Sequence, residues 1–315
     1  MTLKYQLLQA ASLSKGQDRG RYAPSPSGEQ HLGNIRTALV AWLQARLAGG
    51  EFILRMDDLD TPRVRPGSAA QILDDLRWLG MDWDEIEGIN YVADGAGVYV
   101  QSASLSHYQR AFSELKIKGR LFPCDCSRKE IASRVGKPNA GGHYVYPGTC
   151  RHKHSENFPD NTPLTWRFLV KDELICFDDY LMGVQQQNMA RESGDFVVKR
   201  RDGIFAYQLA SVVDDIDMGV TDVVRGEDLL DSTPAQIALF RALGATPPRF
   251  WHLPLKTDAQ GNKLAKRDGS DSLQMLRDAG QSVEQVIGQL AFELGLIDRV
   301  EALGLGALMA EMKSP

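Results

Sequence analysis

The stretch from Arg21 to Asn34 combines residue types that suit an anionic ligand. An arginine precedes a loop rich in Pro, Ser and Gly, and a His-x-Gly element, His31 to Gly33, stands just before an apolar run. This order predicts a strand end, a tight loop and a helix start, where backbone N–H groups and the positive end of the helix dipole meet a ligand. Gly28 and Gly33 let the backbone approach that ligand closely. Taken alone, the stretch fits a nucleotide site and an ordinary Gly-rich loop equally well.

A second candidate lies far downstream, in the basic segment between Gly261 and Gly269. It contains Lys263 and Lys266, three residues apart in a loop flanked by glycine. Two ammonium groups at this spacing would clamp a polyphosphate and stabilise the charge that develops on a pyrophosphate leaving group. A lone basic pentapeptide is more often a solvated surface loop, so the pairing with His31 is what favours a nucleotide site.

Cysteine spacing indicates a metal centre. Cys124 and Cys126 are followed by Cys150 and then by His152 within a region rich in Gly, Pro and His. Three thiolates with one further N or O ligand suit a closed tetrahedral zinc site. Such a site would supply folding free energy to a segment that has few apolar residues. The alternative is a set of unrelated free thiols, and Cys176 is expected to be a buried small residue.

These residues require a scaffold, and the patterning predicts an α/β fold. A buried strand over 51–56 follows the predicted helix after residue 31, which indicates a βαβ unit and a parallel sheet. Ligands bind at the carboxyl ends of such strands. We therefore expect a Rossmann-type, doubly wound parallel sheet with an inserted zinc-binding subdomain and a short helical C-terminal region. The expected parts are a flexible N-terminus over 1–20, the two halves of the Rossmann domain over 21–120 and 166–255, the insertion over 121–165, and a basic loop with short C-terminal helices over 256–315.

Helical spacing and end signals predict further elements. Expected helices cover 68–79, 106–118, 233–243 and 283–294, and expected strands cover 166–170, 196–200 and 251–255.

Composition limits the function classes. The chain has 315 residues, 43% of them hydrophobic, which is enough for a large core and about two domains. No apolar run approaches the length of a membrane span and the start is a poor secretory signal, so we expect a cytoplasmic protein without membrane contact. The net charge of −5 does not favour nucleic-acid binding, although local basic clusters permit a basic face.

Together the His-x-Gly loop and the Lys263–Arg267 segment resemble the two signature motifs of class I aminoacyl-tRNA synthetases. Further motifs, in the same order, are similar to those of the glutamyl-tRNA synthetase family: 21–28, 55–60, 205–210 with the acidic pair 214–215, and 224–229. The resemblance covers residues 20–270. Fewer than fifty residues follow Arg267, too few for the anticodon-binding domains of full-length members. The chain thus resembles the short members of the family, which attach glutamate to the queuosine base in the anticodon loop of tRNA(Asp).

The resemblance implies a site for L-glutamate. Arg21 and Arg225 would pair with its carboxylates, because arginine presents a two-toothed fork to a carboxylate. Asp57 would bind the ammonium group, in a place where the family usually has the longer Glu. Ser25 and Tyr207 would add hydrogen bonds. The loop residues that complete this expected site are Tyr22, Ala23 and Pro24.

It also implies a site for ATP, which would enter with Mg²⁺. His31 and Gly33 would frame the nucleotide, and Lys266 would hold its phosphates beside Lys263. The second His of the family motif is replaced by Asn34, which can still donate a hydrogen bond. The usual Ser of the basic motif is Ala265. His31, Lys263 and Lys266 are the expected catalytic residues.

For the metal, the queuosine-modifying members have a tyrosine four residues before the last cysteine, which matches Tyr146. Some full-length relatives instead have a histidine two residues after it, which matches His152. We favour Tyr146 as the fourth ligand of one structural Zn²⁺, with Cys124, Cys126 and Cys150.

The sequence thus predicts a monomeric ligase that uses ATP, glutamate and queuosine-containing tRNA(Asp). Two alternatives with different readouts are a short glutamyl-tRNA synthetase that charges the tRNA 3′ end and a non-catalytic tRNA-binding relative. A nucleotidyltransferase is a weaker alternative, because the arginine pair is unexplained by it.

Overall fold

The computed structural model describes residues 2–14, 16–87, 92–93, 97–138, 142, 144–159, 162–255 and 272–314. The chain forms two compact units. Unit 1 comprises residues 1–103, 220–228 and 248–315, and unit 2 comprises 104–219 and 229–247. The basic segment 256–271, with Lys263 and Lys266, lies outside the described residues.

Unit 1 is built on a mixed, mostly parallel sheet with the strand order β3-β4-β2-β1-β10-β11. All neighbouring strands in it are parallel except β3 and β4. The strands are β1 (Arg19–Tyr22), β2 (Glu51–Met56), β3 (Val92–Ala93), β4 (Val98–Val100), β10 (Asp222–Gly226) and β11 (Arg249–Leu253). The α/β class with a Rossmann-like sheet is confirmed.

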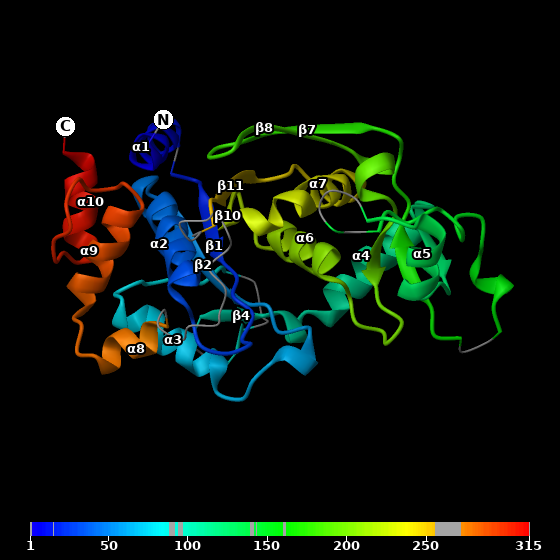
Figure 1. Ribbon diagram of the computed structural model, residues 1–315, viewed down its shortest axis with the longest axis horizontal. Helices are drawn as coiled ribbons and strands as arrows, with labels where there is room; N and C mark the ends of the chain where they lie inside the picture. The colour runs from blue at the N-terminus through cyan, green and yellow to red at the C-terminus, as the bar shows by residue number, and fades with distance from the viewer. Residues whose placement is uncertain are drawn as a thin grey trace. The chain divides into compact units, whose positions relative to one another are not determined.

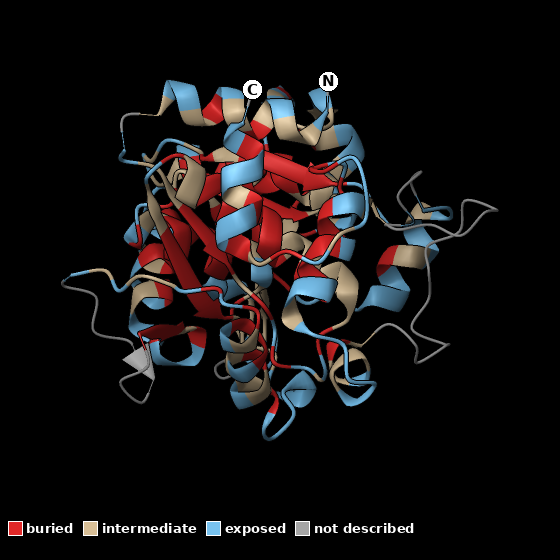
Figure 2. Cartoon of the chain, turned by 90° about the vertical axis from the view of Figure 1, so that its left-hand side faces the viewer, coloured by how far each residue is buried: buried red, intermediate tan, exposed pale blue. Residues whose placement is uncertain are grey.

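Helix α2 (Leu32–Leu47) packs on β1, β2 and β10. Its apolar residues do not form one stripe, and Ala38 to Ala45 are buried without interruption. The reason is that α1 (Leu3–Leu13) covers the helix from outside, so that α2 is enclosed on nearly every side. Figure 2 shows buried residues along the central strands and along the inward faces of the helices.

Further α-helices belong to the described part of unit 1 (Figure 1). They are α3 (Ser68–Trp78), α8 (Leu273–Asp278), α9 (Val283–Glu293) and α10 (Leu305–Lys313). Helix α1 contacts both α2 and α10, which brings the two ends of the chain together. Within residues 1–20, for which the sequence predicts a flexible N-terminus, the structure has helix α1, in which Leu7 and Ala10 are buried and Thr2 is the N-cap.

Unit 2 contains a small antiparallel sheet, β5-β6-β9, and a two-stranded ribbon. The strands are β5 (Leu121–Cys124), β6 (Thr165–Phe168), β9 (Phe196–Lys199), β7 (Leu174–Asp179) and β8 (Gly183–Asn188). The helices are α4 (Leu105–Ile117), α5 (Arg128–Val135), α6 (Tyr207–Asp217) and α7 (Thr233–Ala242). Phe112 joins α4 to the rest through edge contacts with Trp166 and Phe205, at centroid distances of 5.3 and 6.2 Å.

The predicted helices and strands match these bounds to within a few residues. One predicted burial is wrong: Cys176 is exposed on β7 rather than buried. Among the described residues, no helix has both the length and the apolar character needed to cross a bilayer.

Candidate functional site

The carboxyl ends of β1, β2, β10 and β11 meet at one edge of the unit 1 sheet, because these strands are parallel. Two predicted ligands for glutamate lie near this edge on adjacent strands, Arg21 on β1 and Arg225 on β10. Both are only 4% exposed. Arg21 donates from Nη1 to the carbonyl oxygen of Val224, at 3.1 Å, so its guanidinium reaches the residue that precedes Arg225. The structure thus brings the two arginines together.

Arg225 is oriented by a residue that the sequence did not single out. Its Nε donates to Nε2 of His252, at 2.9 Å, and the two residues are register partners on β10 and β11. Its guanidinium also lies over the ring of Phe250, 5.4 Å from the centroid. Hydrogen bonds to neutral acceptors such as imidazole and carbonyl fix the orientation of a guanidinium without cancelling its charge.

The loop between β1 and α2 is held by backbone hydrogen bonds from the segment after β2. The carbonyl of Pro24 accepts from Asp57 N, and that of Pro26 accepts from Arg65 N, each at 2.9 Å. Gly28 has φ of +141°, a conformation that L side chains rarely adopt. Ser25 is exposed on this loop, where a ligand can reach it.

Tyr22 has a structural position. Its hydroxyl donates to Oε1 of Gln30 at 2.6 Å, and the residue is buried. Burial, and then the negative charge of Asp75, raise the pKa of Tyr22, so the phenol stays neutral and tethers the end of the loop. Pro24 is also buried, and Ala23 is half-buried.

His31 is the N-cap of α2. Its Nδ1 accepts from the backbone N–H of Asn34 at 3.3 Å, which leaves Nε2 as the donor of the ring. A Cβ at position 33 would lie 3.0 Å from both Cε1 and Nδ1 of His31. Gly33 is therefore needed for the ring to lie across the helix end, where N–H groups favour an anion.

Asp57 follows β2 and forms a buried ion pair. Oδ1 of Asp57 accepts from Nε of Arg55 at 2.7 Å, and the two side chains are 8% and 1% exposed. The sequence places Arg55 in the family motif over 55–60 but assigns it no role. A binding role for the Asp57 carboxylate stays a prediction.

The other predicted residues belong to unit 2 or to the basic segment. Tyr207 opens α6 in unit 2 and is 37% exposed. Lys263 and Lys266 lie outside the described residues, but the chain on either side of them is described. β11 ends at Leu253 at the carboxyl edge, and Leu273 N donates to the carbonyl of Gln30 at 3.1 Å. The chain that follows the basic segment is thus anchored beside His31, which forms a bridge with Ser272.

The opposite edge of the sheet carries a different arrangement. Asp222, at the start of β10, is fully buried and accepts from Arg249 Nε and Nη2 at 2.9 and 2.6 Å. Trp251 Nε1 donates to the same carboxylate at 3.0 Å. These bonds pair the charges of Asp222 and Arg249 within the protein, so this arrangement has a structural role.

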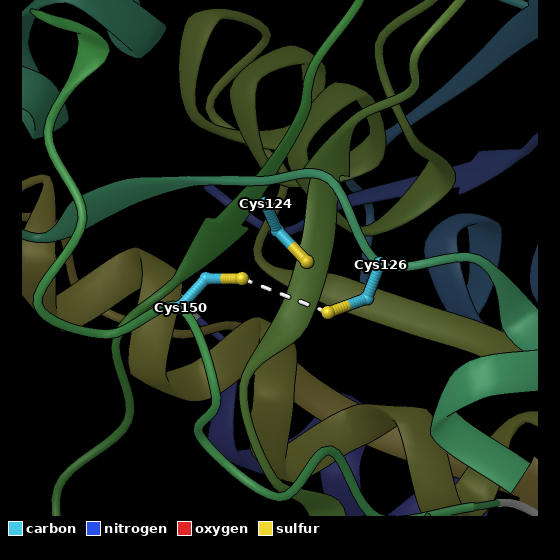
Figure 3. A group of neighbouring side chains, drawn as sticks. All are labelled: Cys124, Cys126 and Cys150. Carbon is cyan, nitrogen blue, oxygen red and sulfur yellow. Dashed lines mark hydrogen bonds between the residues drawn. The ribbon is translucent and has the colours of Figure 1, made fainter. Parts of the chain in front are cut away.

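A separate cluster of thiols lies in unit 2 (Figure 3). The sulfur atoms of Cys124, Cys126 and Cys150 all lie within 4.8 Å of one another, and those of Cys126 and Cys150 are 3.6 Å apart. None of the three forms a disulfide. Cys124 ends β5, Cys126 precedes the capping box of α5, and Cys150 belongs to the turn after Tyr146. The cluster has the ligand set of a metal site.

Tyr146 supplies an oxygen to this cluster. Its hydroxyl lies 3.4 Å from Cys124 Sγ and 3.8 Å from Cys126 Sγ, and it accepts from Cys150 N at 2.9 Å. Tyr146 is buried, whereas His152 is exposed. Three clustered sulfurs with one oxygen beside them form a donor set that suits a tetrahedral ion, so the residues present suit the group that the sequence predicts.

A cation also faces the cluster. The guanidinium of Arg167 lies over the Tyr146 ring, 4.0 Å from its centroid. Burial alone would raise the pKa of Cys124, but hydrogen bonds with Tyr146 and Arg167 outweigh it and lower that pKa. A lowered pKa favours the thiolate form that binds metals. Arg167 could not be recognised from the sequence, because it approaches from β6, far from the cysteines along the chain.

The chain matches a known family over most of its length. Residues 18–295 match the family model described as "tRNA synthetases class I (E and Q), catalytic domain". The chain is 49% identical over 289 residues to the Glutamyl-Q tRNA(Asp) synthetase of Symbiobacterium thermophilum, covering 90% of this chain and 88% of that one. It is 47% identical to the protein of the same name from Nitratidesulfovibrio vulgaris, covering 89% and 87%.

Among solved structures, the chain is similar to a glutamate-tRNA synthetase from Elizabethkingia anophelis. The TM-score is 0.77 with 30% sequence identity, and the match covers 94% of this chain. The chain spans 65% of the length of that protein.

Proposed function

Because this chain belongs to the class I tRNA synthetase family for glutamate and glutamine, we propose that it carries out the reaction of its glutamyl-Q tRNA(Asp) synthetase relatives. It activates L-glutamate with ATP and transfers the glutamyl group to queuosine in tRNA(Asp). The observation that carries this assignment is the identity of 47–49% to two such synthetases, extending over nearly nine tenths of each.

Glutamate is gripped at the carboxyl edge of the unit 1 sheet. Arg21 and Arg225 sit on neighbouring strands, and each is oriented by a hydrogen bond to a neutral acceptor. Two preoriented guanidinium groups suit a ligand with two carboxylates, since each can form a bidentate ion pair. Asp57, Ser25 and Tyr207 complete the proposed set.

ATP binds over the N-terminus of α2. There the N–H groups of the first turn and the Nε2–H of His31 meet the phosphates, and Gly33 leaves room for the His31 ring. Asn34 belongs to the same turn. Lys263 and Lys266 are proposed to close on the phosphates from the segment whose far end is anchored at Gln30, with Mg²⁺ as the counter-ion of the nucleotide.

The chemistry consists of two displacements. A carboxylate oxygen of glutamate attacks the α-phosphorus of ATP, and pyrophosphate leaves to give glutamyl-adenylate. A hydroxyl of the cyclopentenediol ring of queuosine then attacks the acyl carbon, loses its proton, and AMP leaves. Positioning and charge stabilisation account for catalysis, so no side-chain nucleophile is needed.

The thiol cluster is proposed to hold one Zn²⁺ with Tyr146 as fourth ligand. Bound there, the ion would cross-link β5, the start of α5 and the turn at Cys150, a structural contribution. We further propose that the protein acts as a monomer in the cytoplasm, where its substrates occur.

The test is incubation of the purified protein with labelled glutamate, ATP and tRNA(Asp), with and without queuosine. Label on the queuosine-containing tRNA alone, retained after removal of the 3′ terminal adenosine, is the expected result. Label lost with that adenosine would instead identify a glutamyl-tRNA synthetase. Absence of glutamate-dependent ATP–pyrophosphate exchange would identify a non-catalytic relative.

A further inference from the structure

A groove of about 470 Å³ lies in unit 1 between α8, α9 and residues 300–302. It begins at Leu32, the residue that follows His31, and therefore opens beside the N-terminus of α2. None of the residues assigned to glutamate, ATP or the metal lines it. Its size is in the range of pockets for small organic ligands.

The groove is a built feature of the fold. Gly288 permits residues 300–302 to run against α9, since a Cβ at this position would lie 1.7 Å from the carbonyl oxygen of Glu301. Leu303 N fixes the same segment by donating to Glu284 O at 3.0 Å. Val286 and Leu290 form an apolar floor and are each 1% exposed.

Amide groups line one edge of this floor. Gln281, Gln285 and Gln289 follow at intervals of four residues, so they share one side of α9 and of the turn before it. Oε1 of Gln285 accepts from Ser282 N, which leaves its NH₂ group for a ligand. Nε2 of Gln289 donates to Glu293, which leaves its Oε1 for a ligand. A donor and an acceptor therefore stand one helical turn apart.

A cation contacts the lining residue Glu301 at the rim of the groove. Arg299 precedes the lining residue Val300, is 82% exposed at its side chain, and forms an ion pair with Glu301 at 3.1 Å. An exposed ion pair of this kind is weak, so the guanidinium can leave Glu301 and pair with a phosphate instead. An apolar floor, a donor–acceptor edge and a rim cation together match a nucleotide: a flat base, its hydrogen-bonding edge, and its phosphate.

We propose that this groove binds an unpaired base of the tRNA loop that carries the acceptor nucleoside. The proposal rests on the proposed function, and it names how the enzyme would recognise the loop around that nucleoside. Unstacked loop bases are the parts of an RNA that proteins read through hydrogen bonds on the base edge. The groove is close enough to His31 for one loop to reach both, because Leu32 belongs to its wall.

The test uses Gln285→Leu and Gln289→Leu, which remove an amide and keep the side-chain volume. We expect each to raise KM for tRNA about tenfold, through one lost hydrogen bond, with unchanged KM for ATP and glutamate in pyrophosphate exchange. Gln9→Leu, at an exposed glutamine of α1, is the matched control. Gln285 also belongs to the capping box of α9, so its substitution can destabilise the helix. The Gln289 variant lacks this complication, and the melting temperatures of both variants show whether a change in KM comes from lost recognition or from lost stability.

A second arm identifies the base. Queuosine-containing tRNA with a single abasic nucleotide at each other loop position is assayed with the wild-type and the Gln289→Leu protein. We expect one abasic position to raise the KM of the wild type for tRNA about tenfold. The same position should not raise the KM of the variant any further. Unchanged tRNA KM in both variants, or abasic losses that are equal in variant and wild type, would overturn the proposal. Wild-type protein that leaves queuosine-containing tRNA unlabelled would instead overturn the proposed function.

Discussion

Arg225 on β10 and His252 on β11 are joined by a buried hydrogen bond of 2.9 Å between Nε and Nε2. The bond exists because the parallel register places the two residues directly opposite each other. It fixes the orientation of the guanidinium, which makes His252 a positioning residue.

His252→Phe should weaken glutamate binding. Without the acceptor, the buried Nε–H of Arg225 loses its partner at a cost of about 1–3 kcal/mol, and the guanidinium of Arg225 can rotate. We expect KM for glutamate to rise tenfold or more in pyrophosphate exchange, while KM for ATP changes little. His252→Gln, which restores an acceptor, should recover part of the loss. Equal KM values for glutamate in His252→Phe and the wild type would show that the bond does not orient the site.

Gly33→Ala separates activity from stability. Alanine favours a helix over glycine by about 1 kcal/mol, so the melting temperature should stay or rise. The added Cβ, however, would stand 3.0 Å from the His31 ring and displace it. We expect pyrophosphate exchange to fall about tenfold through loss of a phosphate contact.

Gly306→Ala on α10 is the control for that substitution, because a Cβ there meets nothing within 4 Å. It should stabilise the protein and leave exchange unchanged. Full exchange activity in Gly33→Ala would contradict the role given to the His31 ring.

Tyr146→Phe tests the fourth metal ligand. It removes the hydroxyl that lies between Cys124 and Cys126 and that accepts from Cys150 N. We expect less than one zinc per chain by elemental analysis and a melting temperature several degrees lower, because metal binding is coupled to folding. His152→Ala, at an exposed residue, should retain one zinc. Loss of zinc from His152→Ala, with zinc retained in Tyr146→Phe, would identify His152 and not Tyr146 as the fourth ligand.

Lys266→Ala tests the basic segment that precedes the anchor at Gln30. Removal of one ammonium group from the phosphates should slow glutamate-dependent pyrophosphate exchange about a hundredfold. Lys4→Ala, on α1, is the matched control, since Lys4 donates to the carbonyl of Glu311 near the other end of the chain. An unchanged exchange rate in Lys266→Ala would remove this residue from the catalytic set.

Much of the scaffold was predictable from the sequence because its signals are local. Helix spacing and caps locate α3, α7 and α9, and the apolar run after Gly50 locates β2. The spacing of the cysteines is enough to indicate a metal site. Arg21, His31 and Gly33 could be chosen because a loop before a helix has a recognisable residue pattern.

Other features depend on contacts between distant segments. His252 stands opposite Arg225 only because β10 and β11 pair in one register. Tyr146 and His152 lie on either side of Cys150 in the sequence. Only the folded structure distinguishes the two candidates, because Tyr146 is buried beside the sulfurs and His152 is exposed. The sequence predicts a flexible segment over 1–20, yet helix α1 docks on α2 and α10.

The sequence by itself therefore determined the fold class, the residue types of the site and the family that they resemble, because periodicity and motif spacing are properties of neighbouring residues. The tertiary structure decided which side chains share a ligand and which face is left as a groove. Strand register and helix docking are set by packing between residues far apart in the chain, and no local pattern encodes them.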